Sequence, residues 1–179
     1  MFTISLANEG DGQSILGIAA RSGVFTSDEV ACVQELWEAY LRDGEASGYV
    51  FLVYKGEDGQ ALAFLCFGPT PLTEGTFDLY WVCVAPEARG RGIASVMLTR
   101  MELEVAQRGG RLILVETSSL AAYAAARGLY ESRGYQREAV VHDFYSPGDD
   151  LVILQKHLGG GHAEAPASAP VTDALPSAS

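Results

Sequence analysis

The middle of the chain contains a strand, a glycine-rich turn, a helix and a second strand, in that order. Thr76–Val84 is rich in β-branched and aromatic residues, and Pro86 helps to end the strand that this run predicts. After the turn R-G-R-G, apolar side chains recur at helical spacing from Ile93 to about Arg108. Arg111–Glu116 is short and almost wholly apolar, which is typical of a buried central strand. This order predicts a βαβ unit whose two strands are parallel neighbours.

Further elements are predicted on both sides of this unit. The predicted strands are Phe2–Leu6, Tyr49–Lys55, Ala61–Phe67, Tyr135–His142 and Leu151–His157. The predicted helices are Asp11–Ala20, Asp28–Leu41 after an N-cap at Ser27, and Leu120–Ser132 after a cap at Ser118 or Ser119. The stretch F-Y-S-P-G-D-D between the last two strands is interpreted as a turn-rich linker. The predicted fold class is α/β (α+β), with a mixed sheet of about seven strands and flanking helices.

The composition divides the chain into one domain and a tail. Residues 1–158 carry all the periodic segments and are long enough for a single well-filled core. Residues 159–179 are rich in Ala, Pro, Ser and Gly and show no apolar period. We therefore expect a disordered tail after residue 158.

Charge and hydropathy exclude several classes of protein. The net charge of −11 argues against nucleic acid as a partner, because phosphate binding requires a basic face. No apolar run is long enough to cross a membrane, and the N-terminus does not resemble a signal peptide, so we expect a cytoplasmic protein. Three cysteines without metal-ligand spacing predict buried thiols and no metal site. An acidic surface attracts a cationic substrate, although it also simply favours solubility.

The turn Arg89-Gly90-Arg91-Gly92 has the features of an anion site. It joins the end of a strand to the start of a helix, where unpaired backbone N–H groups carry partial positive charge. Glycines let an anion approach the backbone, and pyrophosphate is a natural occupant. The alternative is a tight packing turn with solvated arginines. Neither the dinucleotide fingerprint G-x-G-x-x-G nor the Walker motif is present.

Two blocks of sequence resemble a known family. Arg89-Gly90-Arg91-Gly92-Ile93-Ala94 resembles the signature (Gln or Arg)-x-x-Gly-x-(Gly or Ala) of the GNAT superfamily of acyl-CoA N-acyltransferases. Leu129–Tyr135, L-Y-E-S-R-G-Y, is similar to the L-Y-x-x-x-G-(F/Y) segment of the same family. The blocks have the family's order and separation, and the element order matches the family fold over roughly residues 2–157.

The resemblance implies a cofactor and its binding residues. Acetyl-CoA would be the co-substrate, with no metal, and its pyrophosphate would lie on the N–H groups of Arg89, Gly90, Arg91, Gly92, Ile93, Ala94 and Ser95. The fourth strand would splay from the fifth and open a slot for the pantetheine arm. The backbone of Val82 and Val84 would pair with that arm, and the Val82 N–H would polarise the thioester carbonyl.

The resemblance also implies which residues move protons. Tyr130 occupies the position of the family's general acid, which protonates the leaving thiolate; its alternative role is aromatic packing. Asp78 on the fourth strand and Glu116 at the end of the fifth are candidates for the general base, directly or through water. Each could instead be a hydrogen-bonded carboxylate that orders a loop. Many members carry Asn where this chain has Tyr123, which leaves that contact to pantetheine open.

The function implied is N-acetyl transfer. We expect an enzyme that moves acetyl from acetyl-CoA to a primary amine of a small molecule by direct attack in a ternary complex. The helix Asp28–Leu41 and the loop Gly68–Gly75 would form the acceptor side. Acetylation of a protein N-terminus or lysine, and a non-catalytic acyl-CoA-sensing module, are the alternatives. A homodimer is left open, and no nucleic acid or membrane partner is expected.

Overall fold

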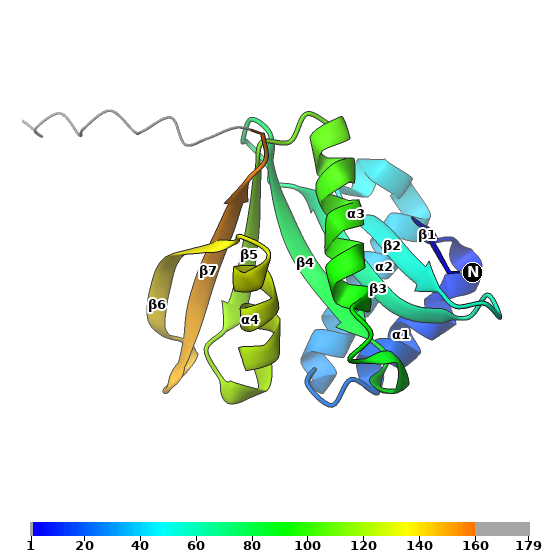
Figure 1. The fold of residues 1–179 in the computed structure, drawn as a ribbon, viewed down its shortest axis with the longest axis horizontal. Coiled ribbons are helices and arrows are strands. Elements are labelled where there is room, and N and C mark those ends of the chain that lie inside the picture. The colour runs from blue at the N-terminus through cyan, green and yellow to red at the C-terminus, as the bar shows by residue number, and fades with distance from the viewer. Residues whose placement is uncertain (1, 160–179) are drawn as a thin grey trace, which may run out of the picture.

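A mixed sheet forms the centre of the computed structural model, which describes residues 2–159 (Figure 1). Its seven strands lie in the order β1-β2-β3-β4-β5-β7-β6. The strands are β1 Thr3–Leu6, β2 Val50–Lys55, β3 Ala61–Pro69, β4 Thr76–Val84, β5 Leu112–Ser118, β6 Gln136–Ser146 and β7 Asp149–His157. The α-helices are α1 Gly12–Ala20, α2 Ser27–Asp43, α3 Ile93–Gln107 and α4 Ala124–Ser132. The predicted fold class is confirmed. A disordered tail is predicted for residues 159–179, and residues 160–179 lie outside the described residues.

The sheet opens between β4 and β5. These strands are parallel and are joined through α3, as the βαβ pattern predicts. They pair only from Thr76 with Leu112 to Leu79 with Val115, after which β4 continues to Val84 without a partner on that side. Figure 1 shows the two strands diverging from a common upper end. The rest of the sheet is antiparallel, so this opening divides it into a β1–β4 part and a β5–β7–β6 part.

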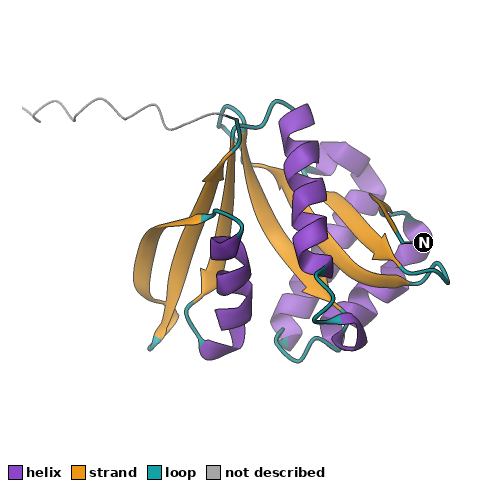
Figure 2. Ribbon diagram, in the orientation of Figure 1, coloured by secondary structure: helices purple, strands orange, loops and turns teal. Residues whose placement is uncertain are grey.

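Helices cover both faces of the sheet. In the view of Figure 2, α3 and α4 lie in front of the strands, and α1 and α2 lie behind them. The apolar stripe of α3 is fully buried at Met97, Met101 and Val105, as its spacing predicts. Behind the sheet, Trp37 of α2 packs edge-on against Phe51 of β2, with ring centroids 5.2 Å apart. The core is continuous across the β1–β4 part and fixes this wall of the opening.

Three local predictions from the sequence are wrong in detail. The helix predicted over Leu120–Ser132 becomes α-helical only at Ala124, after a short 3-10 turn at Ala121–Tyr123, and neither Ser118 nor Ser119 caps it. The N-cap of α2 is Thr26 and not Ser27, because the Thr26 side chain accepts from the Glu29 N–H while the Glu29 side chain accepts from the Thr26 N–H. The linker predicted between the last strands is mostly strand, with only Pro147 and Gly148 as a turn. The Asp150 carboxylate accepts from the Asp143 N–H at 2.9 Å, and this bond replaces regular ladder pairing where β6 bulges.

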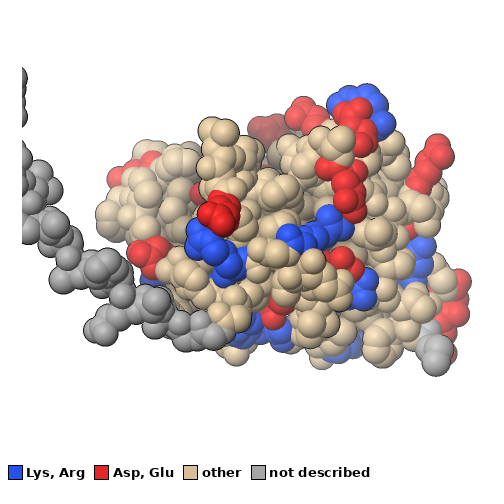
Figure 3. Space-filling model, turned by 90° about the horizontal axis from the view of Figure 1, so that it is seen from above, with Lys and Arg blue, Asp and Glu red and all other residues tan. Residues whose placement is uncertain are grey.

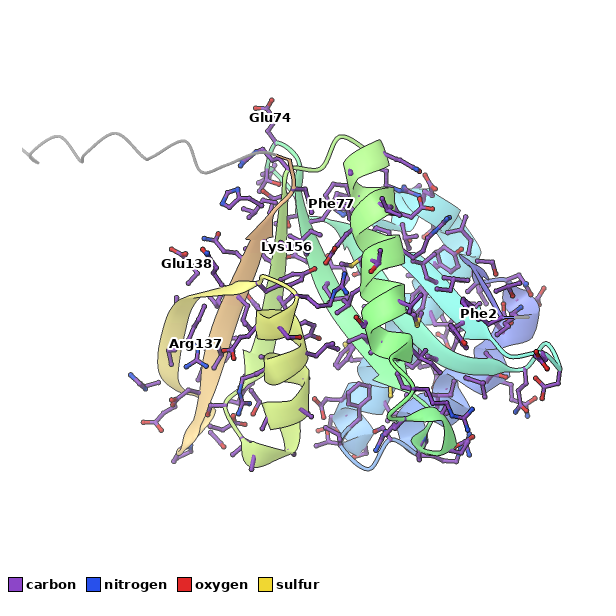
Figure 4. The ribbon with its side chains drawn as sticks, viewed as in Figure 1. Phe2, Glu74, Phe77, Arg137, Glu138 and Lys156 are labelled. Atoms are coloured by element: carbon purple, nitrogen blue, oxygen red, sulfur yellow. The ribbon has the colours of Figure 1, made fainter. Side chains whose placement is uncertain are left out.

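The β6 edge and the outer surface carry charges of both signs. Every residue of β6 is exposed, and Figure 4 labels Arg137 and Glu138 on this strand. Arg137 pairs with Glu131 of α4 at 3.0 Å. The face seen in Figure 3 also mixes acidic and basic side chains and has no continuous basic surface. Within residues 2–159, no helix is long and apolar enough to span a membrane.

Candidate active site

A cavity of about 570 Å³ lies where β4 and β5 diverge. Its walls come from the unpaired end of β4, the turn after it, the first turn of α3, the end of β5 and α4. The structure brings most of the predicted site residues to this cavity. Those that line it are Val82, Val84, Arg89, Gly90, Gly92, Ile93, Ala94, Ser95, Glu116 and Tyr130. Arg91 and Asp78 do not line it.

The first turn of α3 presents free backbone N–H groups to the cavity. Its N-cap is Gly92, which has no side chain to accept from them, whereas α2 is closed by its capping box. Gly90 and Gly92 both have φ of 74°, a left-handed conformation that favours glycine. A Cβ built on either residue meets nothing within 4 Å, so the space above the turn is open. This geometry fits an anion on the helix N-terminus.

The two arginines of the turn are held by backbone carbonyls. Arg89 donates to the Val84 carbonyl at 3.3 Å and to the Ser22 carbonyl in the segment before α2. Arg91 donates to the Glu87 carbonyl at 3.2 Å. Among residues 2–159, neither guanidinium forms an ion pair with a carboxylate. Their charge is therefore available to an anionic ligand.

The free end of β4 directs backbone groups into the opening. The Ala85 N–H donates to the Leu62 carbonyl at 2.8 Å, on the β3 side of the strand. Backbone groups alternate in direction along a strand, so the N–H groups of Val84 and Val82 point to the other side, toward the opening. A bulge at Tyr80 sets this register, since Cys66 pairs with Trp81 and Phe67 with Leu79. This edge offers an extended ligand a strand with which to pair.

Tyr130 is a buried phenol on α4 that lines the cavity. Its residue is 5% exposed, and its ring lies 5.8 Å from that of Tyr135. Burial raises the pKa of the Tyr130 phenol above its ordinary value, because the charged phenolate is disfavoured away from water. The phenol therefore keeps its proton at neutral pH, as a general acid must.

The two candidate bases have different surroundings. Glu116 lines the cavity at the end of β5 and is exposed to it. Asp78 lies on the paired part of β4, where its Oδ2 accepts from the Thr70 hydroxyl at 2.7 Å. The loop predicted to flank the acceptor, Gly68–Gly75, contributes no residue to the cavity. The Asp78 carboxylate thus contacts that loop, whereas Glu116 is a residue of the cavity wall.

Some cavity residues were not expected from the sequence: Glu29 was not singled out, and Tyr123 was considered only as the position of the family's Asn. Glu29 of α2 and Tyr123, just before α4, line the cavity and are joined by a hydrogen bond of 2.7 Å from the Tyr123 hydroxyl to Glu29 Oε1. The pattern Thr26-x-x-Glu29 marks Glu29 as a first-turn residue but does not place it near Tyr123. Phe25 and Trp81 also line the cavity and were not singled out, whereas Tyr145, near the turn between the last two strands, is a cavity residue that the sequence had suggested for the substrate end.

Thiols and metal ligands do not form a separate centre in the described part of the chain. Cys66 and Cys83 are buried and Cys32 is partly buried, and burial raises the pKa of each thiol. Within residues 2–159, no group of three or more His, Cys, Asp or Glu side chains is arranged to hold a metal ion.

The sequence model of the acetyltransferase (GNAT) domain matches residues 46–137, about half of the chain. The chain belongs to the GNAT acetyltransferase family. Enzymes of this family use acetyl-CoA as acetyl donor. The matched segment runs from before β2 into β6 and includes the free edge of β4, the glycine turn and Tyr130.

Solved structures share this fold. A GNAT-family acetyltransferase from Desulfovibrio desulfuricans is 35% identical, with 88% of this chain and 99% of that chain covered and a TM-score of 0.84. The ribosomal-protein-S18-alanine N-acetyltransferase of Escherichia coli is 20% identical, with 91% and 97% covered and a TM-score of 0.72. An acetyltransferase of Salmonella typhimurium, described with acetyl-CoA, is 22% identical, with 94% and 99% covered and a TM-score of 0.68. Among curated proteins, none matches.

Proposed function

We propose that this GNAT enzyme acetylates a primary amine of a small molecule. The observation that supports the proposal is that one cavity is lined both by groups that bind anions and by acidic residues. The turn Arg89–Gly92 and the first turn of α3 supply uncapped N–H groups and the Arg89 guanidinium, whereas Glu116 and Glu29 are acidic residues of the same cavity. An anionic donor such as acetyl-CoA and a cationic acceptor can therefore bind there together.

The residues fit acetyl-CoA as donor. The N–H groups of the α3 first turn, with Arg89 and Arg91, would hold its pyrophosphate, and the free β4 edge at Val82 and Val84 would pair with its pantetheine arm. When bound, it supplies an activated acetyl thioester. The Val82 N–H would then stabilise negative charge on the thioester oxygen.

The proposed reaction needs no covalent enzyme intermediate. The amine nitrogen attacks the thioester carbon, a C–N bond forms and the C–S bond breaks. Before this attack the ammonium loses one proton to Glu116, directly or through water; the departing sulfur takes the Tyr130 proton, and the second proton released by the nitrogen restores the Tyr130 phenol. Glu116 is favoured over Asp78 because Glu116 lines the cavity and the Asp78 carboxylate is engaged by Thr70.

A small acceptor is favoured by the contact between Glu29 and Tyr123. Glu29 belongs to a helix behind the sheet, and Tyr123 precedes a helix in front of it (Figure 1). Their hydrogen bond joins elements from the two faces at the opening and narrows the acceptor side. A protein N-terminus is the second candidate, because the Escherichia coli relative is described as an alanine N-acetyltransferase of a ribosomal protein.

Calorimetry and an acceptor screen test the proposal in sequence. Titration with acetyl-CoA should show saturable binding, and a thiol-release assay should then show turnover with small amines. Absence of acetyl-CoA binding would contradict the whole proposal. Binding without turnover on any amine, amino acid or peptide would instead indicate a sensing module. Faster turnover on basic or alanine-ended peptides than on any small amine would favour the protein acceptor.

A further inference from the structure

The carboxylates at the acceptor end of the cavity are not neutralised by the protein. Glu29 is half-buried, and within residues 2–159 its Oε1 and Oε2 accept only from the Tyr123 hydroxyl and the Thr26 N–H, each at 2.7 Å. Asp149 is buried, and its Oδ1 accepts from the hydroxyl of Ser118, a cavity residue. In the described part of the chain no Lys or Arg forms an ion pair with Glu29, Glu116 or Asp149.

Two other carboxylates of this chain, Asp11 and Glu102, are paired with cations, whereas Asp78 is held, like Glu29, by a neutral hydroxyl donor. Asp11, the other buried carboxylate, lies 2.7 Å from Lys55 Nζ. Glu102 lies between Lys156 and Arg133, at 2.9 and 3.3 Å. A partly buried charge held only by neutral donors is unfavourable for folding alone, and such groups concentrate at functional sites. The unpaired charges around Glu29 therefore indicate a cationic ligand.

The negative charge of these carboxylates also raises the pKa of two neighbouring phenols, Tyr123 and Tyr145. Burial, the hydrogen bond to Glu29 and the charge of Glu29 all raise the pKa of the Tyr123 phenol. Burial raises the pKa of Tyr145, and the carboxylates of Glu116, Asp149 and Glu29 raise it further. No basic side chain opposes these effects at either phenol. Arg89 is the one basic side chain lining the cavity within residues 2–159, and it is bound to backbone at the phosphate end.

Aromatic rings form the remaining wall of the acceptor end. Phe25 and Trp81 meet edge-on with ring centroids 5.1 Å apart, and Tyr80, Tyr123 and Tyr145 also line the cavity. Such rings bind apolar groups by burial and stabilise a nearby cation through their faces. This wall suits an amine carried on an aromatic or apolar body. A carboxylate next to the amine would be repelled by Glu29 and Glu116.

We propose that Glu29 is a specificity-determining residue that binds the acceptor ammonium, and that the acceptor is an arylalkylamine without a carboxylate beside its amine. This inference rests on the proposed acetyl transfer and adds the substrate class. Glu29 has lone pairs left after its two hydrogen bonds, and those bonds fix its position before the ligand arrives. Glu116 remains the group that accepts the proton during transfer.

The substitution Glu29→Gln isolates the charge from the structure. Glutamine at this helix position also completes a capping box: its amide oxygen can accept from the Thr26 N–H, and its NH2 can donate to the Tyr123 hydroxyl oxygen. The test compares tyramine with tyrosine, which differ by one carboxylate, in the thiol-release assay. The native enzyme should prefer tyramine in kcat/KM. In Glu29→Gln the KM for tyramine should rise about tenfold or more, because a charged hydrogen bond contributes about 1.5–3 kcal/mol, and the preference should shrink.

A matched variant separates binding from long-range electrostatics. Glu35→Gln removes the same charge from the same helix, but Glu35 is exposed and does not line the cavity, so the tyramine preference should persist. Equal or faster turnover of tyrosine by the native enzyme, or an unchanged ratio in Glu29→Gln, would overturn the inference while leaving acetyl transfer intact. If no amine releases CoA although acetyl-CoA binds, the proposed function fails, and this inference fails with it.

Discussion

Tyr130 is the residue whose burial and position most directly suggest chemistry. Its phenol lines the cavity, and burial keeps it protonated. Tyr130→Phe removes only the hydroxyl, so the leaving thiolate would take its proton from water instead. We expect kcat to fall about 10²-fold or more, the lower end of the range for a general acid, with acetyl-CoA affinity nearly unchanged. Steady-state thiol release and calorimetry measure the two quantities.

Tyr135 provides the control for this substitution. Its ring packs against Tyr130, but it does not line the cavity. Tyr135→Phe should therefore leave kcat close to that of the native enzyme. Equal losses in both variants would show that packing, rather than proton transfer, explains the effect. An unchanged rate in Tyr130→Phe would remove this phenol from the mechanism.

Single residues also show how far the sequence alone could go. The L-Y-E-S-R-G-Y block singled out Tyr130, and the position of Glu116 after a buried strand placed it near the site. Glu29 and Tyr123 could not be found in this way, because 94 positions separate them and only the packing of α2 against the opening joins them. Asp78 was a candidate because of the family resemblance and its place on the fourth strand, which do not reveal that Thr70 binds its carboxylate.

At the scale of elements, two glycines with open space around them differ in backbone conformation, and so in what a side chain there would do to stability. Gly92 caps α3 with φ of 74°, whereas Gly128 lies inside α4 without a positive φ. A Cβ at either position meets nothing within 4 Å, so sterics between residues do not distinguish them. Their backbone conformation does.

Alanine at these two positions should shift stability in opposite directions. Gly92→Ala forces a left-handed alanine, which costs about 1–2 kcal/mol in the free energy of unfolding and should weaken acetyl-CoA binding. Gly128→Ala should stabilise by about 0.5–1 kcal/mol, because glycine inside a helix is entropically unfavourable. Urea denaturation and calorimetry with acetyl-CoA test the pair. Destabilisation by Gly128→Ala would contradict the argument.

The elements were mostly predictable because their signals are local. Helical spacing located α3, and apolar runs located β4 and β5, within a few residues of their observed ends. The errors at α2 and β6 arose where a side chain, and not another backbone group, forms the hydrogen bond with a backbone N–H. The Asp150 carboxylate holds the Asp143 N–H, so strand structure continues through a segment whose composition favours a turn. The side chain of Thr26, and not that of Ser27, caps α2.

At the scale of the whole molecule, the opening between β4 and β5 is the feature that residue patterns did not predict. Both strands have the composition of fully paired central strands, and only the family resemblance implied that they diverge. The two parts of the sheet are nevertheless tied together beside the opening. Arg133 at the end of α4 donates to Ser95 and Thr99 of α3, each at 2.8 Å, and pairs with Glu102. The cavity is therefore a fixed part of the fold, bounded on both sides by packed elements.

The same burial that protonates the site phenol predicts how the whole molecule responds to alkaline pH. Tyr130 and Tyr135 are 5% and 2% exposed, and burial raises the pKa of both above the ordinary value of 10.0. Above pH 10 the unfolded chain has lost phenol protons that the folded chain retains. Unfolding then releases protons, so the free energy of unfolding falls as pH rises, by about 1.4 kcal/mol per pH unit for each phenol.

Burial also raises the pKa of the Cys66 thiol, from an ordinary value of 9.0, so this thiol likewise lowers the free energy of unfolding as pH rises. The decline in stability should therefore begin near pH 9 and steepen above pH 10, where the phenols contribute. Urea denaturation at intervals from pH 8 to pH 11 measures the slope. Replacing Tyr130 and Tyr135 together with Phe should make the decline above pH 10 less steep and leave the part between pH 9 and pH 10 unchanged; some slope remains, because the pKa values of Tyr123 and Tyr145 are raised as well. An unaltered slope above pH 10 in that double variant would show that these phenols titrate alike in the folded and unfolded chain.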